Sequence, residues 1–155
     1  MDQDKTTLLG EIRYAERLCL RTARLYRHLQ ASNTFLSVLG GSAVISSVGG
    51  QLPLWLPLLG AAVLAIFGAL NIAMRPADKA VANESDARRY ARLRTAGQSM
   101  TADQLRVALA TERESDAQEV ESLRDVAYND LVRELGRDDQ AIPLRMHQRL
   151  LRAMA

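Results

Sequence analysis

The sequence has no charged side chain between Leu29 and Met74, a run of 46 residues in a chain of 155. Over the whole chain, 25% of the residues are charged and 48% are hydrophobic, as in an ordinary globular protein. That average combines one uncharged segment with two highly charged flanks. A soluble domain of this size almost never has such a long uncharged run, and we therefore exclude a simple soluble enzyme domain.

Residues that build metal and disulfide sites are scarce. Cys19 is the only cysteine, which excludes a disulfide scaffold. With two distant histidines, His28 and His147, we predict no metal site and no cofactor. The formal net charge of +2 is not typical of a nucleic-acid-binding protein. No glycine-rich phosphate loop and no set of nucleophile, base and orienting residue is present, so we predict that the protein is not an enzyme.

The uncharged run divides into two parts. Two glycines and a proline at 49–53 predict a turn. Residues 53–74 are apolar enough for a membrane span, which needs about 20 such residues. Residues 29–48 are a weaker candidate because they include Gln30, Asn33 and five serines.

We predict an all-α protein built around a two-span transmembrane helical hairpin. The hairpin covers residues 29–74, with a cytoplasmic amphipathic helix over 1–28 and a cytoplasmic helical region over 75–155. Basic residues flank the run on both sides and are absent from its turn, so we expect both termini in the cytoplasm. A cleaved signal peptide is not expected, because a polar segment precedes the apolar run. The alternative is a buried hairpin inside a soluble helical bundle.

Small and polar side chains recur at helical spacing in both halves of the hairpin. Such patterns let helix backbones approach closely in lipid. They indicate packing within the hairpin or, alternatively, homo-oligomerisation, and the polar members could line a pore. The candidate packing or pore-lining residues are Asn33, Ser37, Gly41, Ser42, Ser46, Ala61, Ala65, Gly68, Ala69 and Asn71.

The first helix is expected to begin at a cap formed by Asp4 or Thr6. An apolar seam follows a heptad pattern, and an arginine stripe lies on the opposite side. We interpret the stripe as a solvated face that also sets topology, or alternatively as a surface for anionic lipid or an acidic partner. Because Cys19 lies in the seam, we interpret it as a small core residue. The seam comprises Leu8, Ile12, Ala15, Cys19, Thr22, Tyr26 and Leu29, and the stripe comprises Arg13, Arg17, Arg21, Arg24 and Arg27.

Further helices are expected after the second span. Pro76 should interrupt the helix, and Asp78 should cap the next one, which ends at Gly97. Thr101 and Gln104 have the spacing of a capping box, which predicts another helix start. No pattern typical of a β-strand and no internal repeat is present.

An acidic stretch at 112–121 precedes the last helices. We interpret it as a solvated helix face, with docking onto the arginine stripe as the alternative. A helical stripe then runs to a stop at Gly136, and Pro143 is expected to open a last short helix. The stripe comprises Val120, Leu123, Ala127, Leu131 and Leu135.

Three stretches of the sequence are similar to a known family. They are residues 15–29 (AERLCLRTARLYRHL), 75–93 (RPADKAVANESDARRYARL) and 123–136 (LRDVAYNDLVRELG), and the Ala127-Tyr128-Asn129 step is the most specific part. Together with the order of helices, they resemble the SLATT family, the SMODS- and SLOG-associating two-transmembrane effector domains of prokaryotes. The resemblance extends over nearly the whole chain.

The resemblance implies a membrane effector of a prokaryotic conflict or antiphage system. Such a protein would lie in the inner membrane, form homo-oligomers, and permeabilise the bilayer when triggered by a sensor protein or a nucleotide messenger. No catalytic or ligand residue of the family is defined by a motif, so none is transferred. The alternatives are a passive membrane anchor that gathers a cytoplasmic partner, and a holin-like hairpin.

Overall fold

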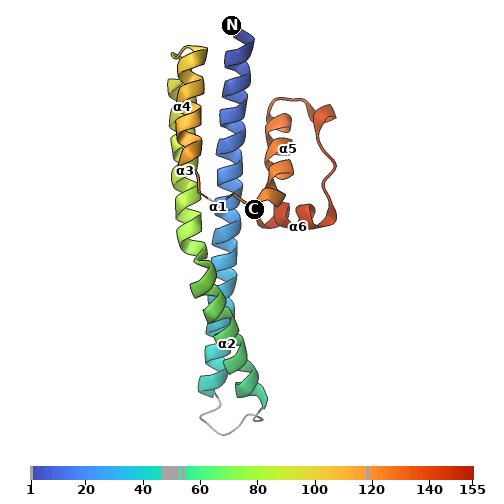
Figure 1. Cartoon of the computed structure of the whole chain (residues 1–155). Coiled ribbons are helices and arrows are strands. Elements are labelled where there is room, and N and C mark those ends of the chain that lie inside the picture. The colour runs from blue at the N-terminus through green and yellow to red at the C-terminus, as the bar shows by residue number, and fades with distance from the viewer. Residues whose placement is uncertain (1, 47–52, 54, 118) are drawn as a thin grey trace. The chain divides into compact units, whose positions relative to one another are not determined.

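The computed structural model describes residues 2–46, 53, 55–117 and 119–155 (Figure 1). These residues form helices joined by turns and contain no strand, which confirms the all-α prediction. Apart from Pro53, the predicted turn at 49–53 lies outside the described residues.

The chain divides into two compact units. Unit 1 comprises Met1–Leu25 and Lys79–Ala155, and unit 2 comprises Tyr26–Asp78. Helix α1, Asp2–Ser46, contributes residues to both units. Each unit has its own packing contacts.

The start of α1 differs from the prediction. The helix is already formed at Asp2, so the predicted cap at Asp4 or Thr6 is wrong. Acidic side chains are favoured in the first turn of a helix, where they face the positive end of its dipole. The helix therefore continues through Asp4 instead of beginning there.

Helix α2, Trp55–Met74, is separated from α3, Pro76–Ala96, by one residue. That residue, Arg75, has a φ of 45°, which breaks the helical path. The predicted interruption at Pro76 is confirmed, and Pro76 occupies the first position of α3, where its missing N–H is tolerated. The predicted cap at Asp78 is wrong, because Asp78 lies in the first turn and pairs with Arg75 at 2.6 Å between Nη2 and Oδ2.

Helix α4, Ala102–Glu114, begins at the predicted capping box. The Gln104 backbone N–H donates to the Thr101 hydroxyl at 3.3 Å, and the Thr101 backbone N–H donates to the Gln104 side chain at 3.0 Å. The predicted stop at Gly97 is also confirmed. A Cβ at Gly97 would lie 2.8 Å from Leu105 Cδ1, so the glycine permits a close approach between turn and helix.

The core of unit 1 joins α1, α3 and α4. Seam residues of α1 face Tyr90, which is 1% exposed, and neighbouring apolar residues of the other two helices. Burial of such side chains stabilises the packing by about 25 cal/mol for each Å² of apolar surface removed from water. The cluster comprises Leu8, Ile12, Ala15, Cys19, Ala87, Tyr90, Leu93, Leu105 and Leu109.

Helix α5, Arg124–Glu134, is shorter than the predicted stripe. Leu123, Ala127 and Leu131 are buried, as a helical stripe requires. Val120, however, is extended and precedes a 3-10 turn, η2, at Glu121–Leu123. The prediction is also wrong at Leu135, which is 49% exposed because Gly136, with a φ of 69°, ends the helix beside it.

The last helix, α6, Met146–Met154, begins later than predicted. It follows a short 3-10 turn, η3, at Asp138–Gln140. Pro143 does not open α6, because the chain before it is held extended by α5. The Asn129 side chain accepts from the Ile142 N–H and donates to the Ile142 carbonyl, both at 2.7 Å. These bonds occupy both backbone groups of Ile142.

In unit 2, α1 and α2 approach closely through two glycines. A Cβ at Gly40 would lie 2.6 Å from the Gly60 carbonyl oxygen and 2.9 Å from the Leu64 backbone nitrogen. A Cβ at Gly60 would lie 2.8 Å from Ala43 Cβ. Carbon atoms do not come this close to backbone atoms, so only glycine fits at the crossing.

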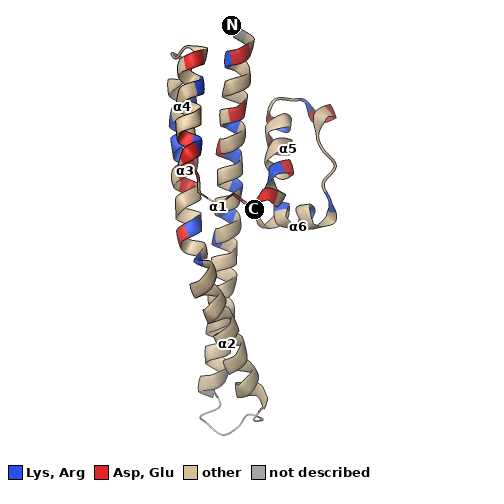
Figure 2. Ribbon diagram, in the orientation of Figure 1, with Lys and Arg blue, Asp and Glu red and all other residues tan. Residues whose placement is uncertain are grey.

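One helical segment among the described residues, Trp55–Ala96, is long and apolar enough to cross a membrane by length and composition. Its apolar part is α2, whose 20 residues extend over about 30 Å, the thickness of a bilayer core. Figure 2 shows no charged residue on α2. Only 6% of the apolar window is buried, whereas the core helix of a soluble bundle is mostly buried.

The predicted first span at 29–48 is not established, so the two-span hairpin is not confirmed. Within the described residues, which end at Ser46 on this side, α1 does not meet the same criterion of length and hydropathy. Its polar residues, such as Gln30 and Asn33, lower the hydropathy of this part of the helix.

We expect Gly40→Ala to destabilise the crossing of unit 2. The added methyl would overlap backbone atoms of α2, and such overpacking costs about 1–3 kcal/mol. Thermal unfolding in detergent, followed by the fluorescence of Trp55, measures the loss.

The neighbouring Gly41 supplies a matched control. A Cβ at Gly41 meets nothing within 4 Å, so Gly41→Ala should leave the unfolding temperature unchanged or raise it slightly. Equal effects of the two substitutions would contradict the crossing.

Candidate functional site

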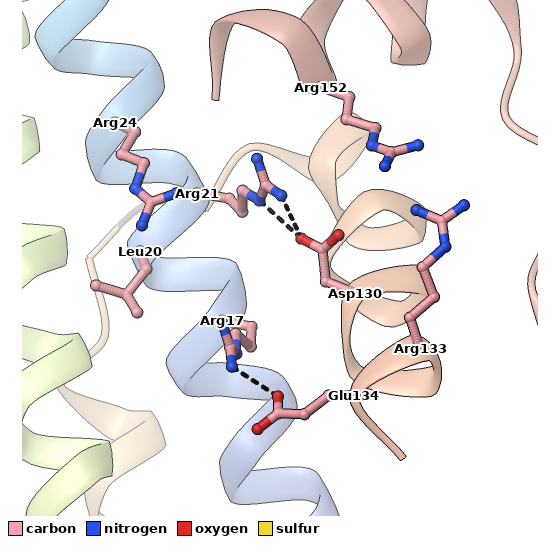
Figure 3. A pocket seen from close by; sticks show the side chains of 8 residues that line it. All are labelled: Arg17, Leu20, Arg21, Arg24, Asp130, Arg133, Glu134 and Arg152. Atoms are coloured by element: carbon pink, nitrogen blue, oxygen red, sulfur yellow. Dashed lines mark hydrogen bonds and ion pairs between the residues drawn. The ribbon is translucent and has the colours of Figure 1, made fainter. Parts of the chain in front are cut away.

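A basic pocket in unit 1 lies among α1, α5 and α6 (Figure 3). Its volume is about 340 Å³. Five arginines and two carboxylates give its lining a formal charge of +3, and a single leucine is the apolar member. We call this site the arginine pocket. It is lined by Arg17, Leu20, Arg21 and Arg24 of α1, by Asp130, Arg133 and Glu134 of α5, and by Arg152 of α6.

Two ion pairs connect the two sides of the pocket. Arg21 donates from Nε to Asp130 Oδ2 at 2.7 Å, and its Nη2 lies 2.6 Å from the same oxygen. Arg17 Nη2 donates to Glu134 Oε2 at 2.6 Å. The side chains of the first pair are 21% and 17% exposed, against 44% and 42% for the second. The first pair is better shielded from water and is therefore the stronger of the two.

The other three arginines of the pocket make weaker ion pairs or none. Arg133 pairs at 3.8 Å with Asp138, which is outside the lining. Arg24 and Arg152 have no ion-pair partner among the residues that the structure describes. Each guanidinium has five N–H donors, so most donors of the pocket remain open to a ligand.

Side-chain amides hold the α5 and α6 sides of the pocket together. Gln148 of α6 is buried and donates from Nε2 to Asp125 Oδ2 of α5 at 2.7 Å. Its Oε1 accepts from the Arg145 backbone N–H at 2.9 Å. Together with the Asn129 bonds to the preceding loop, this contact fixes the helix on which Arg152 stands.

The acidic stretch at 112–121 lies elsewhere in unit 1. Asp116 accepts from the Tyr90 hydroxyl at 2.5 Å, and the Ala117 N–H donates to Asp86 Oδ2 at 2.8 Å. These bonds hold the stretch on α3. The α-helix α4 ends within it at Glu114, and Glu121 begins the 3-10 turn η2. Docking of this stretch onto the arginine stripe is therefore wrong as a prediction, since Arg17 and Arg21 meet acids of α5 instead.

Burial shifts several ionisation equilibria in this part of unit 1. Burial raises the pKa of Asp116, although the Tyr90 hydroxyl and the guanidinium groups of Arg89 and Arg113 lower it. Burial and the bond to Asp116 raise the pKa of Tyr90. Burial also raises the pKa of the Cys19 thiol to about 12, so the thiol stays protonated and unreactive at neutral pH.

The seam and the stripe have different environments. All six seam residues from Leu8 to Tyr26 are buried. Within the stripe, Arg13, Arg17 and Arg21 are half-buried, whereas Arg24 and Arg27 are exposed. The stripe is thus only partly a solvated face.

The predicted small-residue face of α2 does not pack within the hairpin. Ala61, Ala65 and Ala69 are exposed, and the contact with α1 uses Gly60 and Leu64 instead. Packing within the hairpin is therefore wrong for these alanines, because the glycine crossing turns their face outward.

The other predicted hairpin residues are dispersed. Asn33 is buried, Ser37 is half-buried and Asn71 is exposed. A Cβ at Gly41 or Gly68 would meet open space. The Ser42 hydroxyl donates to the Val38 carbonyl of its own helix at 2.8 Å, and Ser46 ends α1.

The prediction from sequence missed the α5 and α6 residues of the arginine pocket. One signal was present, because Asp130 and Glu134 are four residues apart, as are Arg17 and Arg21. Residues at this spacing share a helix face and can form two parallel ion pairs. The sequence contains many other pairs at the same spacing, so the signal alone does not select these partners.

Comparisons of the chain with protein-family models, with curated proteins and with solved structures gave no match. The resemblance to SLATT domains therefore stays a prediction from the residues.

We expect Asp130→Asn to loosen α5 and α6. The substitution removes a charge-assisted bond to Arg21, which is worth about 1–2 kcal/mol in a half-buried setting. Hydrogen–deuterium exchange of residues 124–154 should become several-fold faster. Asp139→Asn, at an exposed position of the same region, is the control and should leave exchange unchanged.

Asp116→Asn should change the pH dependence of stability. A raised carboxyl pKa stabilises the fold at acidic pH, and this contribution is lost as the pH rises through the raised pKa. The amide variant should therefore gain stability relative to the natural chain as the pH rises above about 4, the ordinary pKa of an aspartate. Unfolding temperatures measured across this rise in pH test the expectation, and an unaltered or lower value for the variant at pH 7 would contradict it.

Proposed function

We propose that this protein is a homo-oligomeric effector of the prokaryotic inner membrane, which permeabilises the bilayer when a partner or ligand triggers it. The proposal rests chiefly on α2, an uncharged helix of 20 residues with little burial. Its apolar side chains need lipid or further copies of the chain around them. The resemblance to SLATT domains supports the effector role.

The glycine crossing supports an assembly of hairpins. Because Gly40 and Gly60 bring the two helices of unit 2 together, the alanine face of α2 stays available for contact with another copy. Faces of small residues let helices of neighbouring chains approach closely in lipid. We propose Ala61, Ala65 and Ala69 as this contact.

The proposed topology has two spans and cytoplasmic termini. The first span would comprise residues 29–48, where Asn33 and Ser37 need polar partners inside the assembly. Arginines flank both spans on the proposed cytoplasmic side. A trigger can shift such an assembly from closed to leaky only if it binds the two states differently.

A passive anchor for a cytoplasmic partner is the second candidate. The hydrogen bond of Ser42 to its own helix favours it, since a hydroxyl satisfied in this way is not required for a pore lining. An anchor tolerates Asn33→Leu and Ser37→Leu, whereas changes at the buried Leu123 or Leu131 remove partner binding. A holin-like hairpin explains the helices of unit 1 less well.

Induced expression in bacteria should lower the membrane potential if the proposal is right. Ala65→Leu should restore the potential and weaken cross-linking between copies by on the order of tenfold, because the added bulk separates the helices. A voltage-sensitive dye and cross-linking in isolated membranes provide the two readouts.

Ile66→Leu is the matched control, since it changes an exposed neighbour on the same helix without adding bulk. An unchanged potential at high expression, both with and without the neighbouring genes and with membrane insertion intact, would exclude the permeabilising effector and leave the anchor.

A further inference from the structure

We propose that the arginine pocket binds a small anion with at least two phosphate groups, of the size of pyrophosphate or a nucleoside triphosphate. The inference rests on unit 1 alone and does not require the proposed membrane role. Three helices, α1, α5 and α6, supply the arginines that line the pocket (Figure 3).

The charge of the pocket calls for a multivalent anion. The lining contains five arginines and two carboxylates, so its formal charge is +3. Two of the arginines, Arg24 and Arg152, have no ion-pair partner among the described residues. Like charges brought together around a cavity repel one another, and a bound polyanion removes that cost.

The side-chain chemistry of the pocket selects phosphate oxygens. A guanidinium is a planar fork of donors that matches two oxygens of one phosphate group. Leu20 is the one apolar lining residue, so an apolar ligand would find little complementary surface. The volume of about 340 Å³ falls within the range of small-molecule sites.

The ion pairs of the pocket make binding competitive. Asp130 and Glu134 occupy donors of Arg21 and Arg17 that a phosphate group would also use. Removing a competing carboxylate should therefore tighten anion binding. Removing Arg24 or Arg152, which have no ion-pair partner among the described residues, should weaken it. A nonspecific attraction to basic protein would not depend on which arginine is removed.

Titration calorimetry of the full chain in neutral detergent tests the site with sodium pyrophosphate and with ATP. We expect saturable binding of at least one of the two probes. Arg24→Gln and Arg152→Gln should each weaken it by about tenfold, and Glu134→Gln should strengthen it several-fold. Arg137→Gln removes an exposed arginine outside the lining and should leave the affinity unchanged.

A lipid headgroup could supply the same phosphate chemistry, and a second arm separates the two sources. Flotation with vesicles of phosphatidylcholine, alone or mixed with phosphatidylglycerol, is compared for the natural chain and Arg24→Gln. Selective loss of phosphatidylglycerol binding in the variant, without binding of the soluble probes, would assign the pocket to the single phosphate of a lipid headgroup and would overturn the proposal of a small polyphosphate anion. The proposal is overturned if no probe binds at millimolar concentration, or if Arg137→Gln weakens binding as much as Arg24→Gln.

Discussion

The need to keep an uncharged stretch of 46 residues away from water is the constraint on which this protein depends. Exposure of apolar surface costs about 25 cal/mol for each Å², and α2 alone displays Trp55, Leu58, Ile66 and Ile72, each more than half exposed. A single chain does not cover this surface. In the proposed membrane role, lipid or further copies of the chain cover it, which connects the role to the composition of the sequence.

Unit 1 is constrained differently, because it holds many arginines on a small helical structure. The seam of α1 is buried against α3 and α4, while the arginine stripe reaches toward α5. Acids of α5 neutralise two arginines, and hydrogen bonds of the Asn129 and Gln148 side chains keep α5, its loop and α6 together. Packing and charge therefore divide this part of α1 into a core face and a basic face.

Local signals in the sequence were reliable where a few neighbouring residues decide the backbone. The capping box at Thr101 and the helix stops at Gly97 and Gly136 follow from steric and hydrogen-bonding rules that act within one turn. Predictions failed where a distant contact overrides local preference. Pro143 does not begin a helix, because the Asn129 side chain holds the backbone of Ile142 thirteen residues away. The local preference of residues for a helix is weak, and one pair of hydrogen bonds from a distant side chain outweighs it.

The sequence by itself determined that the chain is helical, that its middle is uncharged, and that an apolar seam runs opposite an arginine stripe, because periodicity and composition depend only on the order of residues. The tertiary structure alone decided which small residues pack and which acids meet the arginines. Gly40 and Gly60 lie at the crossing of the two helices while Ala61, Ala65 and Ala69 are exposed, although all five residues are small. Contacts between distant segments depend on the angle at which helices cross, and the residue pattern along one helix does not determine that angle.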